Sequence, residues 1–255
     1  KSKSYRFQVW LRQQLVKLSV SSSQAVLVAS QSFLKEVQQF LQIPDAKVVL
    51  NPFGISSEKF GHPFHPAGKP FRLLYVSVYG EHKNLSTLLK AILALSEQGT
   101  EGFQLTTTAA PSQIPEVELL TREVDRRLLA HPKIATHVRV IGAIPYEEIE
   151  ELYQQSDLFI FPSLVESFGH PLVEAMASSL AIIASDIPVH REICGEAAIY
   201  FDPLKPSELA QQIVLLMNDS SLRQQLGEVG KKRAQSQFNW QNHVERLLEV
   251  FDRLG

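Results

Sequence analysis

The segment from residue 157 to residue 177 constrains the fold of this 255-residue chain most strongly, because it combines a strand, a sharp turn and a helix. Residues 157–161, DLFIF, form a short apolar run that is typical of a fully buried strand in a parallel sheet. Gly169 and Pro171 mark a turn that leads into a helix with proline near its first position. Residues 172–177 give that helix an apolar face. This pattern predicts an α/β protein with a parallel sheet.

The turn at the start of the predicted helix is a candidate binding site for an anion. The first N–H groups of a helix lack partners inside the helix, and the helix dipole favours a negative charge there. Gly169 allows a ligand to approach the backbone, and phosphate is the usual ligand of such a site. Glu166 precedes the turn, and Glu174 lies one turn into the helix. Because carboxylates accept hydrogen bonds from sugar hydroxyls, the pair is suited to a nucleotide sugar, with a hexose at one end and a ribose at the other.

Residues 166–177, ESFGHPLVEAMA, resemble the E-x7-E signature of the retaining glycosyltransferases of family 4 (glycosyl transferases group 1), which have the GT-B fold. Two isolated glutamates in a βα turn would indicate only a solvated loop. Here the pair accompanies F-G-x-P within the turn and A-M-A after it, and the segment IIASDIP at 182–188 follows, with Glu192 beyond it. The predicted strand, turn and helix supply the structural context that such a motif requires.

After residue 70, strands alternate with helices, which predicts a doubly wound parallel sheet. The resemblance implies a GT-B protein with a Rossmann-like C-terminal domain and only the remnant of a second Rossmann-like domain. The expected parts are a remnant of the N-terminal acceptor domain at 1–60, a linker at 61–70, the C-terminal donor domain at 71–238, and a helix at 239–255 that crosses back to the N-terminal domain. His62 and His65 lie in the Gly- and Pro-rich linker without further metal ligands, so a loop is favoured over a metal site.

The resemblance also assigns roles to single residues. Glu166 would bind the hydroxyls of the donor hexose, Glu174 the ribose diol, and Lys83 the diphosphate; Glu166 and Lys83 are the candidate catalytic residues. Lys83 follows the first strand of the donor domain, so it should lie at the same edge of the sheet as Glu166. The backbone is expected to contact the donor at Phe168, Gly169, His170, Leu172 and Val173. The backbone around Gly142 and Ile144 is expected to lie beside the edge of the base.

Two positions depart from the family pattern. Val78 stands where most relatives have an arginine, and the loss of that cation would weaken stabilisation of the leaving diphosphate. Arg72, Arg139 or His82 could take its place. His170 replaces a small apolar residue; it could donate to the sugar or phosphate, but capping of the helix is the favoured interpretation.

The resemblance implies transfer of a hexose from a donor such as a UDP- or GDP-hexose to an acceptor hydroxyl, with retention of configuration and without a metal or other cofactor. No D-x-D triplet or His/Asp cluster offers a metal site in the sequence. Catalysis would then depend on stabilising the departing nucleotide and on fixing the acceptor. The expected acceptor is a sugar or a lipid-linked molecule, in polysaccharide or glycoconjugate synthesis.

The alternative is a truncated or degenerate module that binds a nucleotide sugar without turnover, and we expect the chain alone to bind its donor weakly and to transfer little. A nicotinamide-dependent oxidoreductase is excluded because no G-x-G-x-x-G follows a strand. A P-loop protein is excluded because the chain lacks G-x-x-x-x-G-K-[ST].

Composition limits the remaining classes of function. The formal net charge of -2 argues against a nucleic-acid-binding protein. Cys194 is the single cysteine, so no internal disulfide can form, and we expect a buried structural thiol in a reducing, cytoplasmic compartment. The sequence has no apolar run that could span a bilayer and no signal-peptide pattern.

Residues 1–18 are predicted to form a basic amphipathic helix. Such a helix could lie on a membrane surface, but a helix that faces a protein core with a solvated basic side is favoured. We therefore expect no membrane contact beyond a peripheral one, made through the part of the N-terminal domain that is absent here.

Overall fold

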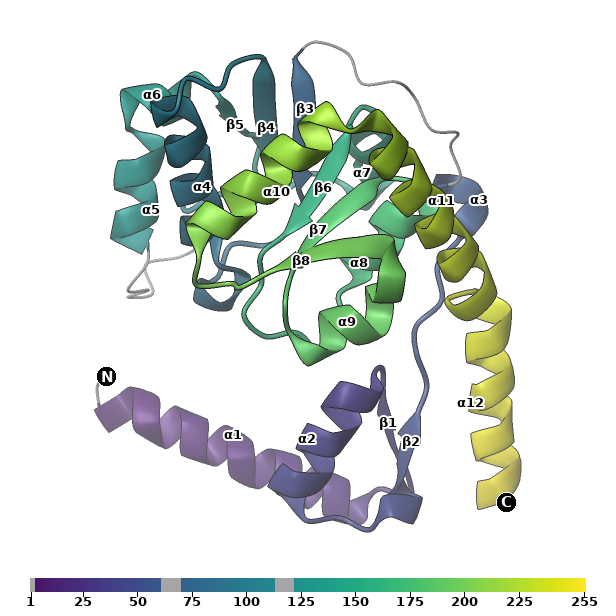
Figure 1. Ribbon diagram of the computed structural model, residues 1–255. Helices are drawn as coiled ribbons and strands as arrows, with labels where there is room; N and C mark the ends of the chain where they lie inside the picture. The colour runs from purple at the N-terminus through teal and green to yellow at the C-terminus, as the bar shows by residue number, and fades with distance from the viewer. Residues whose placement is uncertain (1–2, 61–69, 113–121) are drawn as a thin grey trace.

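The computed structural model describes residues 3–60, 70–112 and 122–255, which form a large and a small α/β unit (Figure 1). The predicted linker falls almost entirely on residues outside this described part, as do His62 and His65. In the described residues, no helix is both long enough and apolar enough to cross a bilayer.

In the described residues, the large unit is built on one parallel sheet of six strands in the order β5-β4-β3-β6-β7-β8. The strands are β3 (Phe71–Tyr75), β4 (Phe103–Thr107), β5 (Val138–Val140), β6 (Leu158–Phe161), β7 (Ala181–Ser185) and β8 (Ala198–Phe201). The predicted α/β fold with a parallel sheet is therefore confirmed. Every residue of β6 is buried, as its uninterrupted apolar sequence requires.

The order of the strands creates a crevice at the carboxyl ends of β3 and β6. The chain runs outward from β3 through β4 to β5, and then returns to β6 on the other side of β3 and runs outward to β8. The connections that leave β3 and β6 therefore diverge to opposite sides. In open α/β sheets, ligands bind at such a switch point.

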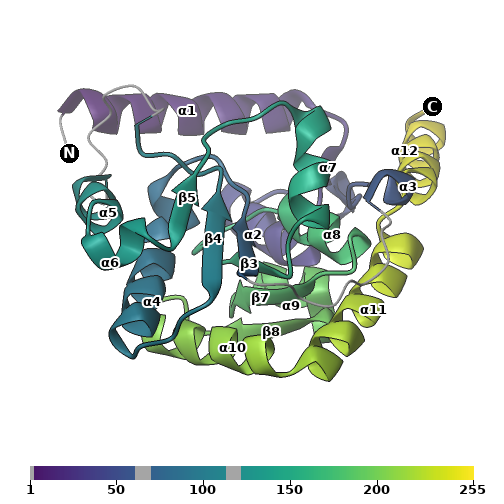
Figure 2. The same cartoon turned by 90° about the horizontal axis from the view of Figure 1, so that it is seen from above.

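Helices cover both faces of this sheet (Figures 1 and 2). Helices α4 and α10 pack against each other, and α8 packs against α11. The helices are α4 (Leu85–Glu97), α5 (Arg122–Leu129), α6 (Pro132–Ala135), α7 (Tyr146–Gln154), α8 (His170–Ala177), α9 (Pro188–Cys194), α10 (Pro206–Asn218) and α11 (Ser220–Gln237). The sequence predicts a helix over 116–129, of which the part before residue 122 lies outside the described residues.

The small unit contains two short parallel strands and their flanking helices. They are α1 (Lys3–Ser22), β1 (Val26–Val28), α2 (Gln31–Leu41), β2 (Val48–Leu50) and the short α3 (Ser57–Phe60). The interpretation of the first helix as core-facing is wrong for this structure, because Phe7, Trp10 and Leu18 are 60%, 53% and 64% exposed. In the described residues, these two short strands offer too small a surface to bury that helix.

The last helix, α12 (Trp240–Leu254), starts against the segment that leaves the small unit. The Ile55 N–H group donates to the Phe238 carbonyl at 2.7 Å, and His243 Nδ1 lies 3.0 Å from the Pro52 carbonyl. Gly54 permits this approach, since a Cβ atom there would lie 2.5 Å from the Trp240 nitrogen. The segment that leaves the small unit and the start of α12 therefore lie side by side and are joined by hydrogen bonds.

Candidate functional site

An ion pair occupies the crevice at the carboxyl ends of β3 and β6. Lys83 Nζ lies 2.5 Å from Glu166 Oε1, and the side chains are 19% and 10% exposed. Lys83 comes from the short helical turn Glu81–Lys83 after β3, and Glu166 from the loop after β6. The structure thus brings together the two residues that the sequence predicts to be catalytic, from positions 83 residues apart.

The two loops that carry this pair are fixed to each other. The Asn84 side-chain amide donates to the Pro162 carbonyl at 3.0 Å and to the Pro203 carbonyl at 2.9 Å. Asn84 has φ 56, a left-handed conformation that asparagine adopts more readily than most residues. The Tyr75 hydroxyl donates to the Lys83 carbonyl at 2.7 Å. Lys83 is therefore held at its backbone, while its ammonium group points to the pair.

The turn after Glu166 needs glycine. Gly169 has φ 90, and a Cβ atom there would lie 3.2 Å from Leu172 and 3.5 Å from the Phe161 ring. The helix α8 begins directly afterwards, with Pro171 in its first turn. The side chains of Phe168, Leu172 and Val173 are buried, and Phe168 and Val173 also line a pocket beside this turn. The Leu172 N–H group donates to the Gly169 carbonyl at 2.9 Å in this structure.

Glu174 lies in a different environment from Glu166. It is 6% exposed, and the Tyr153 hydroxyl donates to its Oε2 at 2.8 Å. Burial raises the pKa of Glu174, while hydrogen bonds from Tyr153 and Tyr146 and the nearby Lys59 ammonium oppose this rise. The two tyrosines are seven residues apart and face the same side of α7. They hold the carboxylate in place but leave it next to a pocket.

This pocket has a volume of about 380 Å³ and is mostly apolar. Its walls come from the loops after β3, β4 and β5 and from α7 and α8, and include Val76, Val78, Ala110, Ile144, Ile149 and Glu174. Ile144, which the resemblance places at the edge of the base, lines this pocket. Gly142 is buried at φ 74 in the same loop and is not among the pocket-lining residues.

A second pocket of about 510 Å³ adjoins the first. Tyr146, His170 and Glu174 line both pockets, so this histidine and this carboxylate stand at their boundary. Its other walls include Gly54, Ile55, Lys59 and Trp240, which lie in or near the two segments that connect the units.

The His170 side chain does not cap its helix. The N-cap position of α8 is Gly169, and no side chain caps this helix, so the favoured capping interpretation is wrong. The His170 ring instead packs on the rings of Phe53, at 4.7 Å, and Phe168, at 5.1 Å. Burial lowers the pKa of His170, and the nearby Glu166 carboxylate opposes this shift.

The structure separates the three candidates for the missing cation at Val78. Val78 is 79% exposed at the mouth of the first pocket. Arg72 forms an ion pair with Asp157 at 2.7 Å, and it shares a different pocket with Arg139. Neither arginine is therefore available to the crevice. His82, next to Lys83, is the remaining candidate.

No group of three or more His, Cys, Asp or Glu side chains that could hold a metal ion occurs among the described residues. Cys194 is a buried free thiol, and burial raises its pKa to about 12, as expected for a structural cysteine.

Sequence reasoning missed Tyr146 and Tyr153, which orient Glu174. Their seven-residue spacing on a predicted helix was the available signal. It also missed the contacts of Ser30 and Glu192, which no local pattern could reveal because they join residues at least 137 positions apart.

Comparison with known proteins gives one family. Residues 56–233 match the family model described as glycosyl transferases group 1. The chain is 24% identical over 247 residues to the O-antigen chain mannosyltransferase B of Escherichia coli, covering 92% of this chain and 62% of that protein. It is 29% identical over 174 residues to the MMP alpha-(1->4)-mannosyltransferase of Mycolicibacterium hassiacum, covering 67% of this chain and 40% of that protein.

Solved structures show the same fold. Sucrose-phosphate synthase from Thermosynechococcus elongatus has a TM-score of 0.81 at 21% identity and is covered over 61% of its length. Anabaena HepE, solved in complex with UDP and glucose, has a TM-score of 0.78 at 16% identity and is covered over 67% of its length. These matches confirm the GT-B type of α/β fold. The chain spans about 60% or less of the curated relatives that it matches here.

Proposed function

The chain belongs to the family of glycosyl transferases group 1, and from that premise we propose that it forms the donor-binding part of a retaining hexosyltransferase. The reaction would move a hexose from a nucleoside-diphosphate sugar to an acceptor hydroxyl with retention of configuration. Within the GT-B enzymes we assign the chain to family 4, on the E-x7-E segment between Glu166 and Glu174.

One observation carries this proposal: an ion pair and a helix N-terminus meet at the switch point of the sheet. Lys83 and Glu166 are bonded at 2.5 Å beside the Gly169 turn, where α8 starts. A diphosphate needs positive charge, which the ammonium group and the helix N-terminus supply. A hexose needs hydrogen-bond acceptors, which the Glu166 carboxylate supplies.

The nucleoside would occupy the apolar pocket. Val76, Val78 and Ile144 offer a surface for the flat face of a base. The Glu174 carboxylate at the end of that pocket would accept hydrogen bonds from both ribose hydroxyls, with its orientation set by Tyr153. This placement puts the ribose at Glu174 and the hexose at Glu166, with the diphosphate between them.

Bond cleavage leaves negative charge on the departing nucleoside diphosphate. Lys83 is held in place through its backbone, so its charge is preorganised for that moment. We propose that this lysine and the first N–H groups of α8 stabilise the leaving group without a metal ion. Val78 provides no charge at the mouth of the pocket, so Lys83 is the side-chain cation that we assign to the leaving group.

The names of the relatives support the choice of donor class. Two matched proteins are named mannosyltransferases, and a neighbour of the same fold was solved with UDP and glucose. We therefore propose a UDP- or GDP-hexose as donor and a sugar or lipid-linked acceptor in polysaccharide or glycoconjugate synthesis. The reaction would take place in the cytoplasm, at the membrane surface where the acceptor is lipid-linked.

A module that binds the donor without turnover is the second candidate, and the exposed Val78 favours it. Where a cation would stabilise the leaving group, this side chain contributes none. Such a module would bind nucleotide sugars and leave them intact in the presence of every acceptor.

The experiment that tests the proposal is thermal unfolding of the chain with UDP-, GDP- and ADP-sugars. A ligand that binds only the folded state raises its stability by about 2.7 kcal/mol at a concentration of 100 times Kd. We expect one nucleotide class to raise Tm, by an amount that grows with the logarithm of its concentration above Kd. If none of the sugars shifts Tm up to millimolar concentration, the proposal is wrong.

A further inference from the structure

Helix α2 of the small unit begins against the donor-binding turn of the large unit. Ser30 is its N-cap residue and is fully buried. The Ser30 hydroxyl accepts a hydrogen bond from the Phe33 N–H group at 3.1 Å and donates to the Ser167 carbonyl at 2.8 Å. Ser167 lies directly after Glu166, so this contact reaches the loop that carries the candidate catalytic carboxylate.

One carboxylate of the large unit satisfies the rest of this helix N-terminus. The Gln31 N–H group donates to Glu192 Oε1 at 2.5 Å, and the Ser32 N–H group donates to Glu192 Oε2 at 2.8 Å. The Ser32 hydroxyl also donates to Oε2, at 2.7 Å. The first turn of a helix leaves its N–H groups without internal partners. Here Ser30 and Glu192 together supply a partner for each of the first three.

Helix α2 depends on this contact more than a buried helix would. It has eleven residues, none of them buried, and its own first turn contains no acidic side chain. A helix of this length is marginal by itself, and a negative charge at its N-terminus stabilises it. The Glu192 side chain provides that charge from a position 160 residues along the chain.

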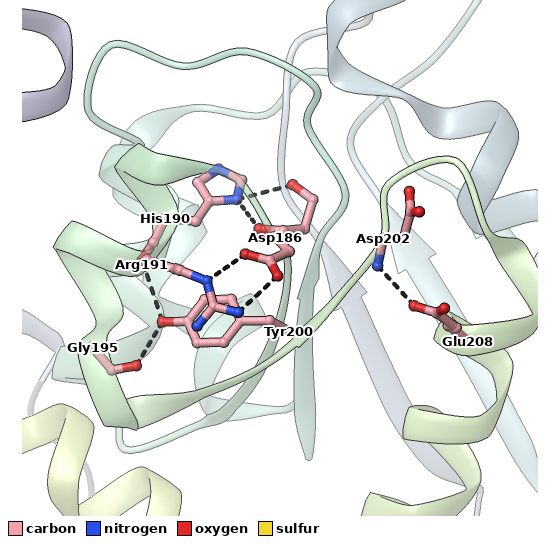
Figure 3. Close-up of polar contacts among 8 residues, drawn as sticks. Asp186, His190, Arg191, Gly195, Tyr200, Asp202 and Glu208 are labelled. Carbon is pink, nitrogen blue, oxygen red and sulfur yellow. Dashed lines mark hydrogen bonds and ion pairs between the residues drawn. The ribbon is translucent and has the colours of Figure 1, made fainter.

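The helix that carries Glu192 is itself fixed to the large unit (Figure 3). Arg191 pairs with Asp186, and the Tyr200 hydroxyl donates to the Gly195 carbonyl at 2.6 Å. Burial lowers the pKa of His190 to about 4, so its neutral ring can donate from Nδ1 to the Ser185 carbonyl at 3.0 Å.

Further contacts fix the end of β7, which precedes α9, to the loop before Glu166, and fix α9 itself to α11. The Ser185 hydroxyl donates to the Ser163 carbonyl in that loop. Arg233 donates to the carbonyls of Ile193 and Glu192, each at 2.7 Å. The backbone at Glu192 is therefore held to the rest of the large unit by several hydrogen bonds.

We infer that Glu192 is a positioning residue that docks α2 onto the large unit and, through Ser30, fixes the Ser167 carbonyl next to Glu166. The docking itself does not depend on the proposed function. Its effect on the hexose end of the donor rests on that function, because Ser167 adjoins Glu166 and not Glu174.

The docking is tested by hydrogen exchange in the chain without ligand. Glu192→Ala removes a charged acceptor from two N–H groups, so we expect exchange of the α2 amides to accelerate by about tenfold or more. Glu192→Gln keeps one acceptor oxygen and should give an intermediate rate. Glu196→Ala removes an exposed glutamate near the end of α9 and should leave α2 unchanged. Equal exchange of α2 in wild type and Glu192→Ala would overturn the inference.

Amides of β6 and β7 serve as the internal reference for the fold. If they also accelerate in Glu192→Ala, the variant is globally destabilised, and Ser30→Ala is used in its place. That variant keeps the Glu192 carboxylate but loses the contact with Ser167, so it should accelerate exchange at the first turn of α2. An unchanged rate there would again contradict the inference.

The effect on the donor is tested by titration with UDP-glucose, GDP-mannose, UDP and GDP. We expect Glu192→Ala to weaken binding of the nucleotide sugar by about three- to tenfold and binding of the nucleoside diphosphate hardly at all. Equal weakening of both, or of neither, would contradict the link to the hexose end. If the wild type binds none of these ligands, the proposed function fails, while the hydrogen-exchange result still decides the role of Glu192.

Discussion

Glu166 and Glu174 belong to one motif but are held in opposite ways. Glu166 lies on a loop and is paired with the Lys83 ammonium group. Glu174 is buried on a helix and accepts hydrogen bonds from tyrosine hydroxyls. The first carboxylate thus lies beside a cation, whereas burial of the second penalises its charged form. We propose that this difference suits Glu166 to the reacting sugar of a donor and Glu174, eight positions later, to its ribose.

The largest effect should come from breaking the ion pair. Glu166→Gln leaves Lys83 without its partner in a largely buried position, so we expect the free energy of unfolding to fall. The loss should lie between the ~1 kcal/mol of an exposed pair and the ~3–5 kcal/mol of a fully buried one. Denaturant unfolding measures it, with Glu123→Gln, in the exposed pair with Arg127, as the matched control. A loss no larger than that of the control would remove the contrast between the two glutamates.

A smaller effect is expected at the support of Glu174. Tyr153→Phe removes the hydroxyl that donates to Glu174 Oε2 at 2.8 Å and should cost about 1–2 kcal/mol of unfolding free energy. Tyr146→Phe is the control, because Tyr146 is 52% exposed and water can replace its hydroxyl. If both variants lose the same stability, Tyr153 does not have the special role assigned to it.

Glu174→Gln should have the opposite sign to Glu166→Gln. The pKa of Glu174 is raised above 4.5 in the folded state. The folded state therefore loses stability as pH rises from 4.5 to this raised pKa. A neutral glutamine avoids this loss, and Tm at pH 7 should therefore increase. The increase should vanish below the ordinary glutamate value of 4.5, where the wild-type carboxyl is protonated in both states. A lower Tm at pH 7 would mean that the tyrosines more than offset the burial of the charge.

The smallest effect is expected at Val78. Val78→Arg adds a cation to an exposed position at the mouth of the pocket that we propose for the nucleoside, so affinity for a nucleoside diphosphate should rise by about two- to fivefold at low salt. Isothermal titration at two ionic strengths measures this change, with Val78→Gln as the uncharged control. An equal gain in both variants would show that charge is not its cause.

The sequence predicts those parts of the molecule that follow from local patterns. The apolar run of β6 and the glycine turn follow from composition and spacing. The family resemblance singles out Lys83, and its approach to Glu166 follows from the rule that the carboxyl ends of parallel strands share an edge. What it cannot predict depends on partners distant in sequence. The position of His170 at the start of a helix suggests a cap, but its ring packs on Phe53 instead. The apolar residues of α1 are not covered by any other part of the described residues.

The most direct test of the account compares binding of a nucleotide sugar with binding of its nucleoside diphosphate to Glu166→Ala and Glu174→Ala, by isothermal titration. The account predicts that Glu174→Ala weakens both ligands by a similar factor, because both contain the ribose. It predicts that Glu166→Ala weakens the nucleotide sugar selectively, because only that ligand contains the hexose. Equal weakening of both ligands by Glu166→Ala, or unchanged binding in Glu174→Ala, would contradict the assignment of the two glutamates to opposite ends of the donor.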